Sequence, residues 1–321
     1  MYELIAKNKR KSWFVFLGMG LLLLILGGLI GLFVEPTERG LITGIGIASC
    51  LWIIQSLVAM TNGTNVIMQG MNAQQITPEE DTVLHNVIEE ITLSSGLPMP
   101  KIYIIDTPAL NAFAAGIKPQ KSIVAITRGL REKLTRQEMQ AVMAHEMAHI
   151  YNRDVMYMTF ASVMMCTIVI VSNLLVRSFL WGGGGRKSNS KGGNGIGQLI
   201  IIAVVILLAI LAPLFAQLFY FSLSRKREYL ADTVAVNFTR DPDSLANALA
   251  KISGDTEKFN PGKMAAAMCI NKPMKAHKES LFSTHPPIQK RIEILRAMSM
   301  GTDYESYRAA YQQVMGKDDL P

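Results

Sequence analysis

Four long apolar runs constrain the fold of this chain more than any other feature of its sequence. They span residues 13–34, 40–60, 155–176 and 196–223, and none of them contains a charged residue. Each run has at least about 20 residues, and a helix of that length crosses roughly 30 Å of hydrocarbon. Because 50% of all residues are hydrophobic, a share at the high end for a soluble domain, the sequence predicts a membrane protein with about four transmembrane helices.

The charges beside these runs predict a topology. Four basic residues in segment 7–11 precede the first run, which places the N-terminus in the cytoplasm. Residues 33–36 make a poor cleavage site, so we interpret the first run as a retained anchor rather than a signal peptide. The basic segment 225–227 follows the fourth run and agrees with this orientation. The Gly-rich loop 182–195 is also basic and disagrees with it, but the first helix usually dominates.

Residues 145–149 read His-Glu-Met-Ala-His and predict a metal site. On a helix, positions i and i+4 share one face, so His145 and His149 can bind one Zn²⁺. Glu146 then lies close enough to polarise a water molecule beside the metal. Segment 138–144 contains no Gly or Pro and favours a helix. The alternative interpretation is a pair of surface histidines that bind no metal.

A catalytic zinc site needs a third protein ligand and leaves one position open. The three cysteines lie far apart and form no CxxC pair, which argues against a thiolate site. The candidate is Glu228, with Asp232 four residues later on the same helical face. Asp232 could orient a ligand histidine through its other ring nitrogen. The alternative for segment 224–232 is a solvated, charged helix start after a membrane exit.

The remaining pattern predicts a small sheet surrounded by helices. A Thr-Pro-Glu-Glu start at 77–80 opens a helix that ends near 94–96, and a capping box at 135–138 opens the zinc helix, which ends near 152–154. Strands are expected at 101–106 and 123–127, with a strand or sheet edge at 111–114 and helices around 246–252 and 287–298. An extended peptide can pair with such an edge.

Five segments in the same order resemble the HtpX-type membrane zinc endopeptidases, relatives of the CAAX prenyl proteases. They are residues 96–106, 111–116, 145–154, 224–232 and 283–287. The resemblance implies that His145, His149 and Glu228 bind zinc and that Glu146 is the general base. It also implies that Asn111 lies on the substrate-binding strand and that His285 contacts the substrate or the oxyanion.

A His-Pro-Pro turn is also a common structural element, which is the alternative reading of His285. The implied activity is cleavage of misfolded or damaged membrane proteins within their cytoplasmic segments, as quality control and stress response. The expected reaction uses water as nucleophile and Glu146 as proton carrier, without a covalent acyl-enzyme.

The predicted fold class is an α+β membrane protein, mainly helical and zincin-like, with a small β-sheet. The predicted domains are a transmembrane hairpin (1–60), the first half of a cytoplasmic protease domain (61–154), a second hairpin (155–223) and the second half of the protease domain (224–321). The whole would lie in the cytoplasmic membrane, with the N-terminus, active site and C-terminus on the cytoplasmic side.

The net charge of +7 is concentrated beside the apolar runs, which favours contact with anionic lipid headgroups. The sequence has no nucleic-acid-binding motif, so the expected partners are protein substrates and the bilayer. Three alternatives are weighed. A CAAX-type prenyl protease, as the resemblance has it, uses seven spans rather than four. A non-catalytic zinc-binding scaffold would not need Glu146. A metal transporter would carry its ligands inside a span.

Overall fold

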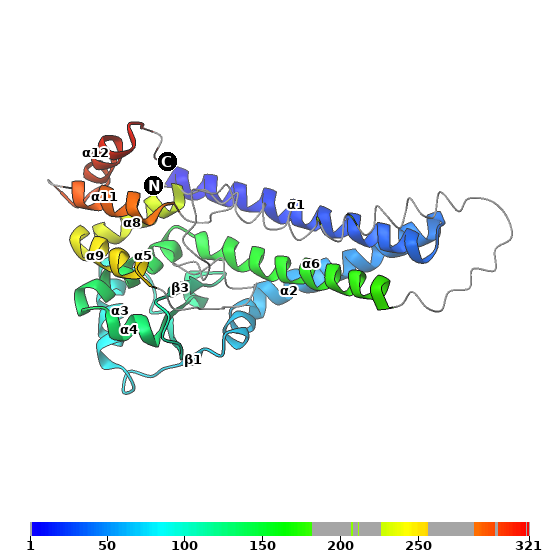
Figure 1. Ribbon diagram of the computed structural model, residues 1–321, viewed down its shortest axis with the longest axis horizontal. Coiled ribbons are helices and arrows are strands. Elements are labelled where there is room, and N and C mark those ends of the chain that lie inside the picture. Colours follow the sequence, from blue (N-terminus) through cyan, green and yellow to red (C-terminus); the bar gives the residue numbers. More distant parts are fainter. Residues whose placement is uncertain are drawn as a thin grey trace. The chain divides into compact units, whose positions relative to one another are not determined.

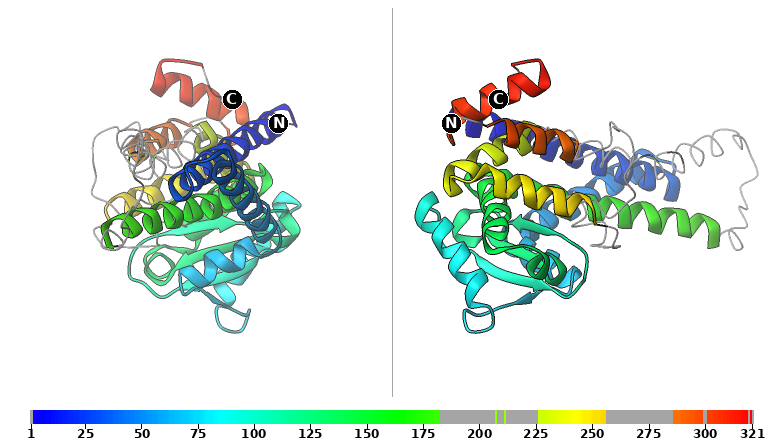
Figure 2. Two further views of the ribbon diagram at one scale, coloured as in Figure 1. Left: turned by 90° about the vertical axis from the view of Figure 1, so that its right-hand side faces the viewer. Right: turned by 60° about the vertical axis from the view of Figure 1, so that its left-hand side comes forward.

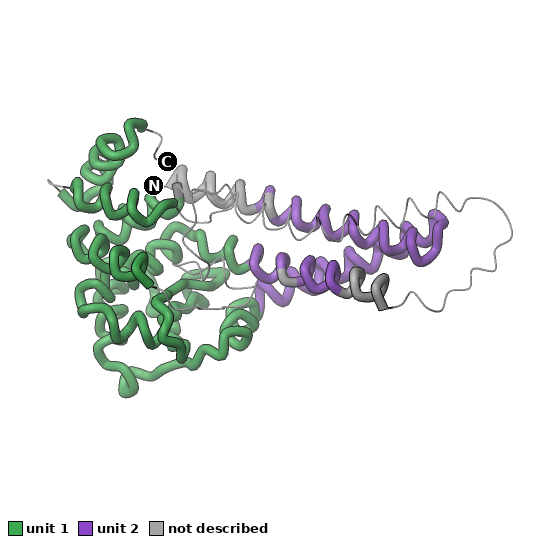
Figure 3. Tube along the Cα trace, in the orientation of Figure 1, with its two compact units in different colours: residues 1–10, 62–159, 223–321 green, residues 11–61, 160–222 purple. Residues whose placement is uncertain are grey.

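The computed structural model describes residues 2–181, 207, 211, 226–255, 286–298, 301–318 and 320. The chain divides into two compact units, which Figure 3 shows in different colours. Unit 1 comprises residues 1–10, 62–159 and 223–321, and unit 2 comprises residues 11–61 and 160–222. Each unit is therefore built from segments that are far apart in the sequence.

Three of the predicted apolar runs form long helices. They lie in α1 (Tyr2–Val34), α2 (Glu38–Gly70) and α6 (Asp154–Trp181), and each of these helices is long and apolar enough to cross a membrane. The described residues thus contain three candidate spans, which confirms a membrane protein of mainly helical class. The fourth run and the Gly-rich loop 182–195 lie outside the described residues, apart from positions 207 and 211.

Helices α1 and α2 both belong largely to unit 2 (Figure 1 labels them). They approach each other closely at pairs of glycines. A Cβ atom added to Gly27 would lie 2.7 Å from the carbonyl oxygen of Gly44, and one added to Gly44 would collide with the carbonyl oxygen of Gly27. Gly31 and Gly40 meet in the same way nearer the turn. Small residues at these positions allow two apolar helices to gain van der Waals contact without side chains between them.

Unit 1 contains a four-stranded sheet in the described part of the chain. Its strands are β1 (Gln74–Gln75), β2 (Lys101–Ile105), β3 (Ala112–Ala115) and β4 (Ile123–Thr127), in the order β1-β2-β4-β3. Strands β2 and β4 are parallel, whereas β1 and β3 pair antiparallel with their neighbours. The predicted strands are confirmed within a residue, and β3 lies at the edge of this sheet.

Both faces of the sheet are buried. Alternate residues of a strand point to opposite sides. Ile102, Ile104 and the even-numbered residues of β3 and β4 join the hydrophobic cluster of the helices. Tyr103 and Ile105 face the other way and pack with Ile67 and Met68 at the end of α2.

Helix α5 (Arg136–Tyr151) is the centre of unit 1. It contacts α3 (Thr82–Ser95), strands β3 and β4, α8 (Lys226–Thr239) and α9 (Pro242–Ser253) (Figure 2). Beyond these, α11 (Ile288–Ala297) packs on α9 and on α12 (Tyr304–Met315), and α12 also contacts α8. Two short helices, α4 (Arg128–Lys133) and the 3-10 turn η1 (Pro119–Lys121), flank the sheet. Helix α5 is thus packed against other elements on several sides.

The capping signals were predicted correctly for α5 and incorrectly for α3. At α5 both bonds of the capping box form between Thr135 and Glu138. Helix α3 begins at Thr82 instead of beside Pro78, and its cap is Asp81, which accepts a bond from the Leu84 backbone at 3.0 Å. Because Arg131 holds the Asp81 carboxylate at 2.6 and 2.9 Å, this cap is anchored, while residues 78–80 form only a turn.

Candidate metal centre

Helix α5 presents two histidines on a buried face. His145 is 1% exposed and His149 is 6% exposed, and their ring centroids lie 4.9 Å apart. An imidazole buried among apolar side chains is unfavourable unless its nitrogens find polar partners. The surroundings of these two rings therefore decide what the site can bind.

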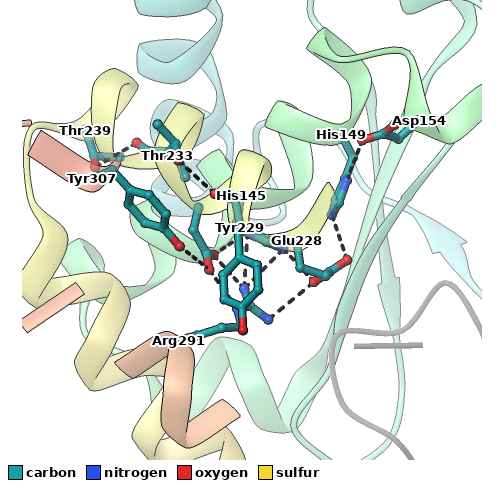
Figure 4. Close-up of polar contacts among 11 residues, drawn as sticks. His145, His149, Asp154, Glu228, Tyr229, Thr233, Thr239, Arg291 and Tyr307 are labelled. Carbon is teal, nitrogen blue, oxygen red and sulfur yellow. Dashed lines mark hydrogen bonds and ion pairs between the residues drawn. The ribbon is translucent and has the colours of Figure 1, made fainter. Parts of the chain in front are cut away.

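Glu228 on α8 lies opposite both rings (Figure 4). Its Oε2 lies 3.6 Å from His145 Nε2, and its Oε1 lies 3.6 Å from His149 Nε2. The three side chains each offer one ligand atom, and these atoms all lie within 4.8 Å of one another. One carboxylate thus faces two imidazole nitrogens across a small gap.

These distances fit a divalent metal ion. Ligand atoms bonded to Zn²⁺ at about 2.0–2.2 Å in tetrahedral geometry stand roughly 3.3–3.6 Å apart. The observed separations of 3.6 Å match that spacing and exceed the length of an ordinary hydrogen bond. Two imidazoles and one carboxylate are also a donor set suited to a borderline ion such as zinc.

The other nitrogen of each ring has a carboxylate of its own. His145 Nδ1 lies 3.0 Å from Asp232 Oδ1, and His149 Nδ1 lies 3.3 Å from Asp154 Oδ2. A carboxylate that accepts the Nδ1 proton leaves the Nε2 lone pair free for a metal and fixes the orientation of the ring. Both lone pairs then point to the gap beside Glu228.

The electrostatic potential in the site is negative. Burial and the charge of Arg291 lower the pKa of His145, but hydrogen bonds to Asp232 and Glu228 outweigh them and raise it to about 9. Burial likewise lowers the pKa of His149, and its bond to Asp154 raises it above the ordinary value. The same excess of carboxylates that favours a proton on these rings favours a bound cation.

A buried arginine that sequence reasoning missed completes the site. Arg291 on α11 has no exposed surface, and its Nε and Nη2 donate to the two oxygens of Asp232 at 2.8 and 2.6 Å. Its Nη1 donates to Glu228 at 3.3 Å. The sequence did carry a signal for Arg291. Residues 288, 291, 292 and 295 have the spacing of one face of a helix, and every one of them except Arg291 is apolar. A charge on such a face needs a buried partner.

The remaining predicted residues are placed as follows. Glu146 is 3% exposed and follows His145 on α5. Asn111 is buried directly before β3, where its side-chain oxygen accepts a bond from the Ala112 backbone at 3.0 Å. His285 lies outside the described residues. The structure therefore brings together His145, His149, Glu228 and Asp232, which lie on two helices separated by the long segment between α5 and α8.

The sequence model of peptidase family M48 matches residues 78–299, more than half of the chain. The chain belongs to this family. Protease HtpX homologs from Listeria monocytogenes serotype 4a and from Ligilactobacillus salivarius are each 40% identical, over 306 and 299 residues, and each alignment covers 93% of this chain and 100% of the relative. A homolog from Streptococcus uberis is 38% identical over 302 residues, with the same coverage.

Among solved structures, Ste24p from S. mikatae matches with 21% identity and a TM-score of 0.48, covering 92% of this chain and 67% of that one. Membership in family M48 makes this chain a metalloprotease, and its long apolar helices make it a membrane protein. The family assignment thus agrees with a divalent metal at the cluster of His145, His149 and Glu228.

Proposed function

We propose that this protein is a zinc-dependent endopeptidase of the cytoplasmic membrane that cleaves misfolded or damaged membrane proteins within their cytoplasmic segments. The observation that carries the proposal is the convergence of two Nε2 atoms from α5, the helix that also carries Glu146, on the two oxygens of Glu228, each at 3.6 Å. Three protein ligands leave one coordination position for chemistry, as in catalytic rather than structural zinc sites.

His145, His149 and Glu228 would hold the ion. Zinc held there supplies a Lewis acid that polarises a peptide carbonyl and makes a water molecule more acidic. Glu146 takes the proton of the attacking water and passes it to the leaving amine. Its place on α5, buried and directly after His145 in the sequence, supports this role.

Strand β3 supports a role in holding the substrate. It lies at the edge of the described sheet and contacts α5, which carries both histidines. An extended peptide paired with such an edge presents its backbone at a fixed height. Asn111 at the start of β3, and His285 from the segment before α11, would donate hydrogen bonds to the substrate or to the developing oxyanion.

The cytoplasmic location rests on the basic segment 7–11 before the first span. Residues 1–10 belong to unit 1, the unit that also contains the metal cluster. This grouping supports a common side for the N-terminus and the active site. The predicted domain halves 61–154 and 224–321 would then form one protease domain on that side.

Glu146→Gln tests the mechanism. The amide keeps the shape of the side chain but cannot accept a proton, so zinc stays bound while turnover is lost. We expect a loss greater than the roughly 10²–10⁴-fold typical of acid–base help alone, because activation of the nucleophile is lost too. The measurement pairs zinc stoichiometry with chelator-sensitive cleavage of casein by the purified full-length protein.

Glu89→Gln on the exposed face of α3 is the matched control and should retain parental activity. Parental cleavage by Glu146→Gln with zinc retained would remove Glu146 from the mechanism. Absence of cleavage by the parent would favour a non-catalytic zinc-binding scaffold. Cleavage sites mapped by mass spectrometry on membrane proteins test the substrate class, and sites confined to external segments would contradict it.

A further inference from the structure

Arg291 is a fully buried charge near the metal cluster, and the proposed mechanism does not use it. It has no exposed surface, and it lies on α11, a helix that carries none of the proposed metal ligands. An unpaired arginine at such a position would be strongly destabilising. Its partners therefore explain why the fold retains it.

The guanidinium has one main partner, Asp232, and lesser contacts to Glu228 and to His145, whose two ring nitrogens each lie 3.4 Å from Nη2. It forms a two-pronged pair with Asp232, through bonds of 2.8 and 2.6 Å, and a longer bond of 3.3 Å to Glu228. Asp232 in turn lies 3.0 Å from His145 Nδ1. The planar fork of arginine restricts the rotation of a carboxylate far more than a single donor does.

Tyr307 on α12 adds a weak third contact, because its hydroxyl donates to Asp232 Oδ2 at 3.5 Å. Asp232 is thus fixed by groups from α11 and α12, while it holds a ring on α5 (Figure 4 shows Arg291, Tyr307 and His145 around this point). Few orientations of its carboxylate satisfy all of these partners.

We propose that Arg291 is a positioning residue of the metal centre, acting through the carboxylates of Asp232 and Glu228. The fork fixes Asp232 against His145 Nδ1, which sets the ring so that Nε2 faces the metal position. The bond to Glu228 holds the third ligand in line with both rings. Docking of α11 therefore completes the ligand geometry. This inference rests on the proposed metal site.

Arg291 has two opposing effects on metal affinity. Its positive charge repels a cation, while its hydrogen bonds order the ligands. The shorter bonds go to Asp232, which is not itself a ligand, so most of the charge is neutralised there. Ordering should therefore dominate, and loss of a group that orients a metal ligand typically weakens affinity by about 10- to 100-fold.

The experiment compares the full-length protein with Arg291→Met and Arg291→Lys. Each protein is purified in detergent, stripped with a chelator and titrated with zinc against a competing indicator. Co²⁺ is then added in place of zinc, because its visible absorption reports the coordination geometry. Leu295→Ala is the control, since this residue is also fully buried on α11 and its loss weakens packing without removing a charge.

We expect Arg291→Met to bind zinc 10- to 100-fold more weakly and to change the Co²⁺ spectrum. The zinc affinity of Arg291→Lys should fall between those of Arg291→Met and the parent, since lysine keeps the positive charge but loses the two-pronged guanidinium. Leu295→Ala should unfold at a lower temperature with parental zinc affinity and spectrum.

Two outcomes overturn the inference: parental or tighter zinc binding by both Arg291 variants, or equal weakening by Leu295→Ala. If Arg291→Met fails to fold, Arg291→Lys alone decides, and parental affinity there overturns the inference. If the parent protein itself binds no zinc, the proposed function is wrong. This result is distinct from failure of the inference on Arg291, because it is seen in the parent alone.

Discussion

Glu228 differs from Asp232 and Asp154 in the ring nitrogens that it faces. It faces Nε2 of both histidines, whereas Asp232 and Asp154 each face one Nδ1. A carboxylate at Nδ1 completes a hydrogen bond, whereas a carboxylate that faces two Nε2 atoms is placed to share a bound cation with them. The roles of these acids therefore follow from their position around the rings.

This difference predicts unequal effects of two substitutions. Glu228→Ala removes a bond to the metal, so zinc affinity should fall by more than about 100-fold. Asp232→Ala removes only an orienting group and should cost about 10- to 100-fold. Zinc titration of the chelated variants provides the measurement. Parental affinity in Glu228→Ala would mean that the third ligand lies elsewhere.

The sequence identified part of this site because the signal was local. His145 and His149, and likewise Glu228 and Asp232, are pairs four residues apart on helices, and that spacing is visible without a structure. Arg291 is 59 residues from Asp232 and 63 from Glu228, so only tertiary packing brings them together. Asp154 follows α5, but its contact with His149 comes with the positive-φ conformation of Arg153 between them, which the sequence does not reveal.

At the scale of elements, α5 is fixed at its first turn by one side chain with two roles. Glu138 closes the capping box with Thr135, and it also accepts a bond from Lys251 on α9 at 2.7 Å. Burial raises the pKa of Glu138, but the bonds from Lys251 and Thr135 outweigh it and hold the pKa below its ordinary 4.5. The helix that carries both histidines is thus stabilised by an ionised carboxylate.

This predicts a pH-dependent loss of stability. A carboxylate with a depressed pKa stabilises the fold fully above its unfolded value of about 4.5, and that contribution is lost as the pH falls through the lower folded value. Glu138→Gln should destabilise unit 1 by about 0.5–2 kcal/mol at pH 7 and by much less near pH 3. Thermal unfolding at both pH values checks this, and a difference that is independent of pH would contradict it.

The helix hairpin of unit 2 allows a second test at this scale. Gly44 is buried against Gly27 on α1, whereas a Cβ added to Gly46, on the same helix, would meet nothing within 4 Å. Alanine improves helix propensity equally at both sites. Gly44→Ala should therefore lower the unfolding temperature in detergent, since overpacking costs about 1–3 kcal/mol. Gly46→Ala should not lower the unfolding temperature. Equal unfolding temperatures of the two variants would contradict the close approach of α1 and α2.

The sequence did not predict elements whose position depends on strand pairing or on a side chain far away in the sequence. Strand β1 has two residues, Gln74 and Gln75, with no apolar alternation, and it is ordered by pairing with β2. The start of α3 depends on Arg131, which is 50 residues from the Asp81 cap that it holds. The strands β2 and β4 and the helix α5 were predictable because their apolar patterns and the capping box are contained in the segments themselves.

At the scale of the whole molecule, the metal cluster constrains the path of the chain. His145 and His149 precede segment 155–223 and Glu228 follows it, yet one ion would join them. The segment must therefore cross the membrane an even number of times or not at all. Because α6 within it is apolar enough to span, the chain is expected to cross back before residue 224.

Cysteine labelling tests this path. Ser188→Cys and Thr256→Cys, both outside the described residues, are placed singly in a chain without native cysteines and treated on intact cells with an impermeant thiol reagent. We expect labelling at 188 and protection at 256. Protection at both positions would mean that the second hairpin does not cross, and labelling at 256 alone would invert the topology.

The split of the donor set around segment 155–223 also orders events during translation. A ribosome synthesises the two histidines of α5 first, and it reaches Glu228 only after the intervening apolar segment 155–223. Arg291 follows later still. A nascent or truncated chain thus holds two histidines without their acidic partner, so the proposed metal ligands can come together only after segment 155–223 has been synthesised.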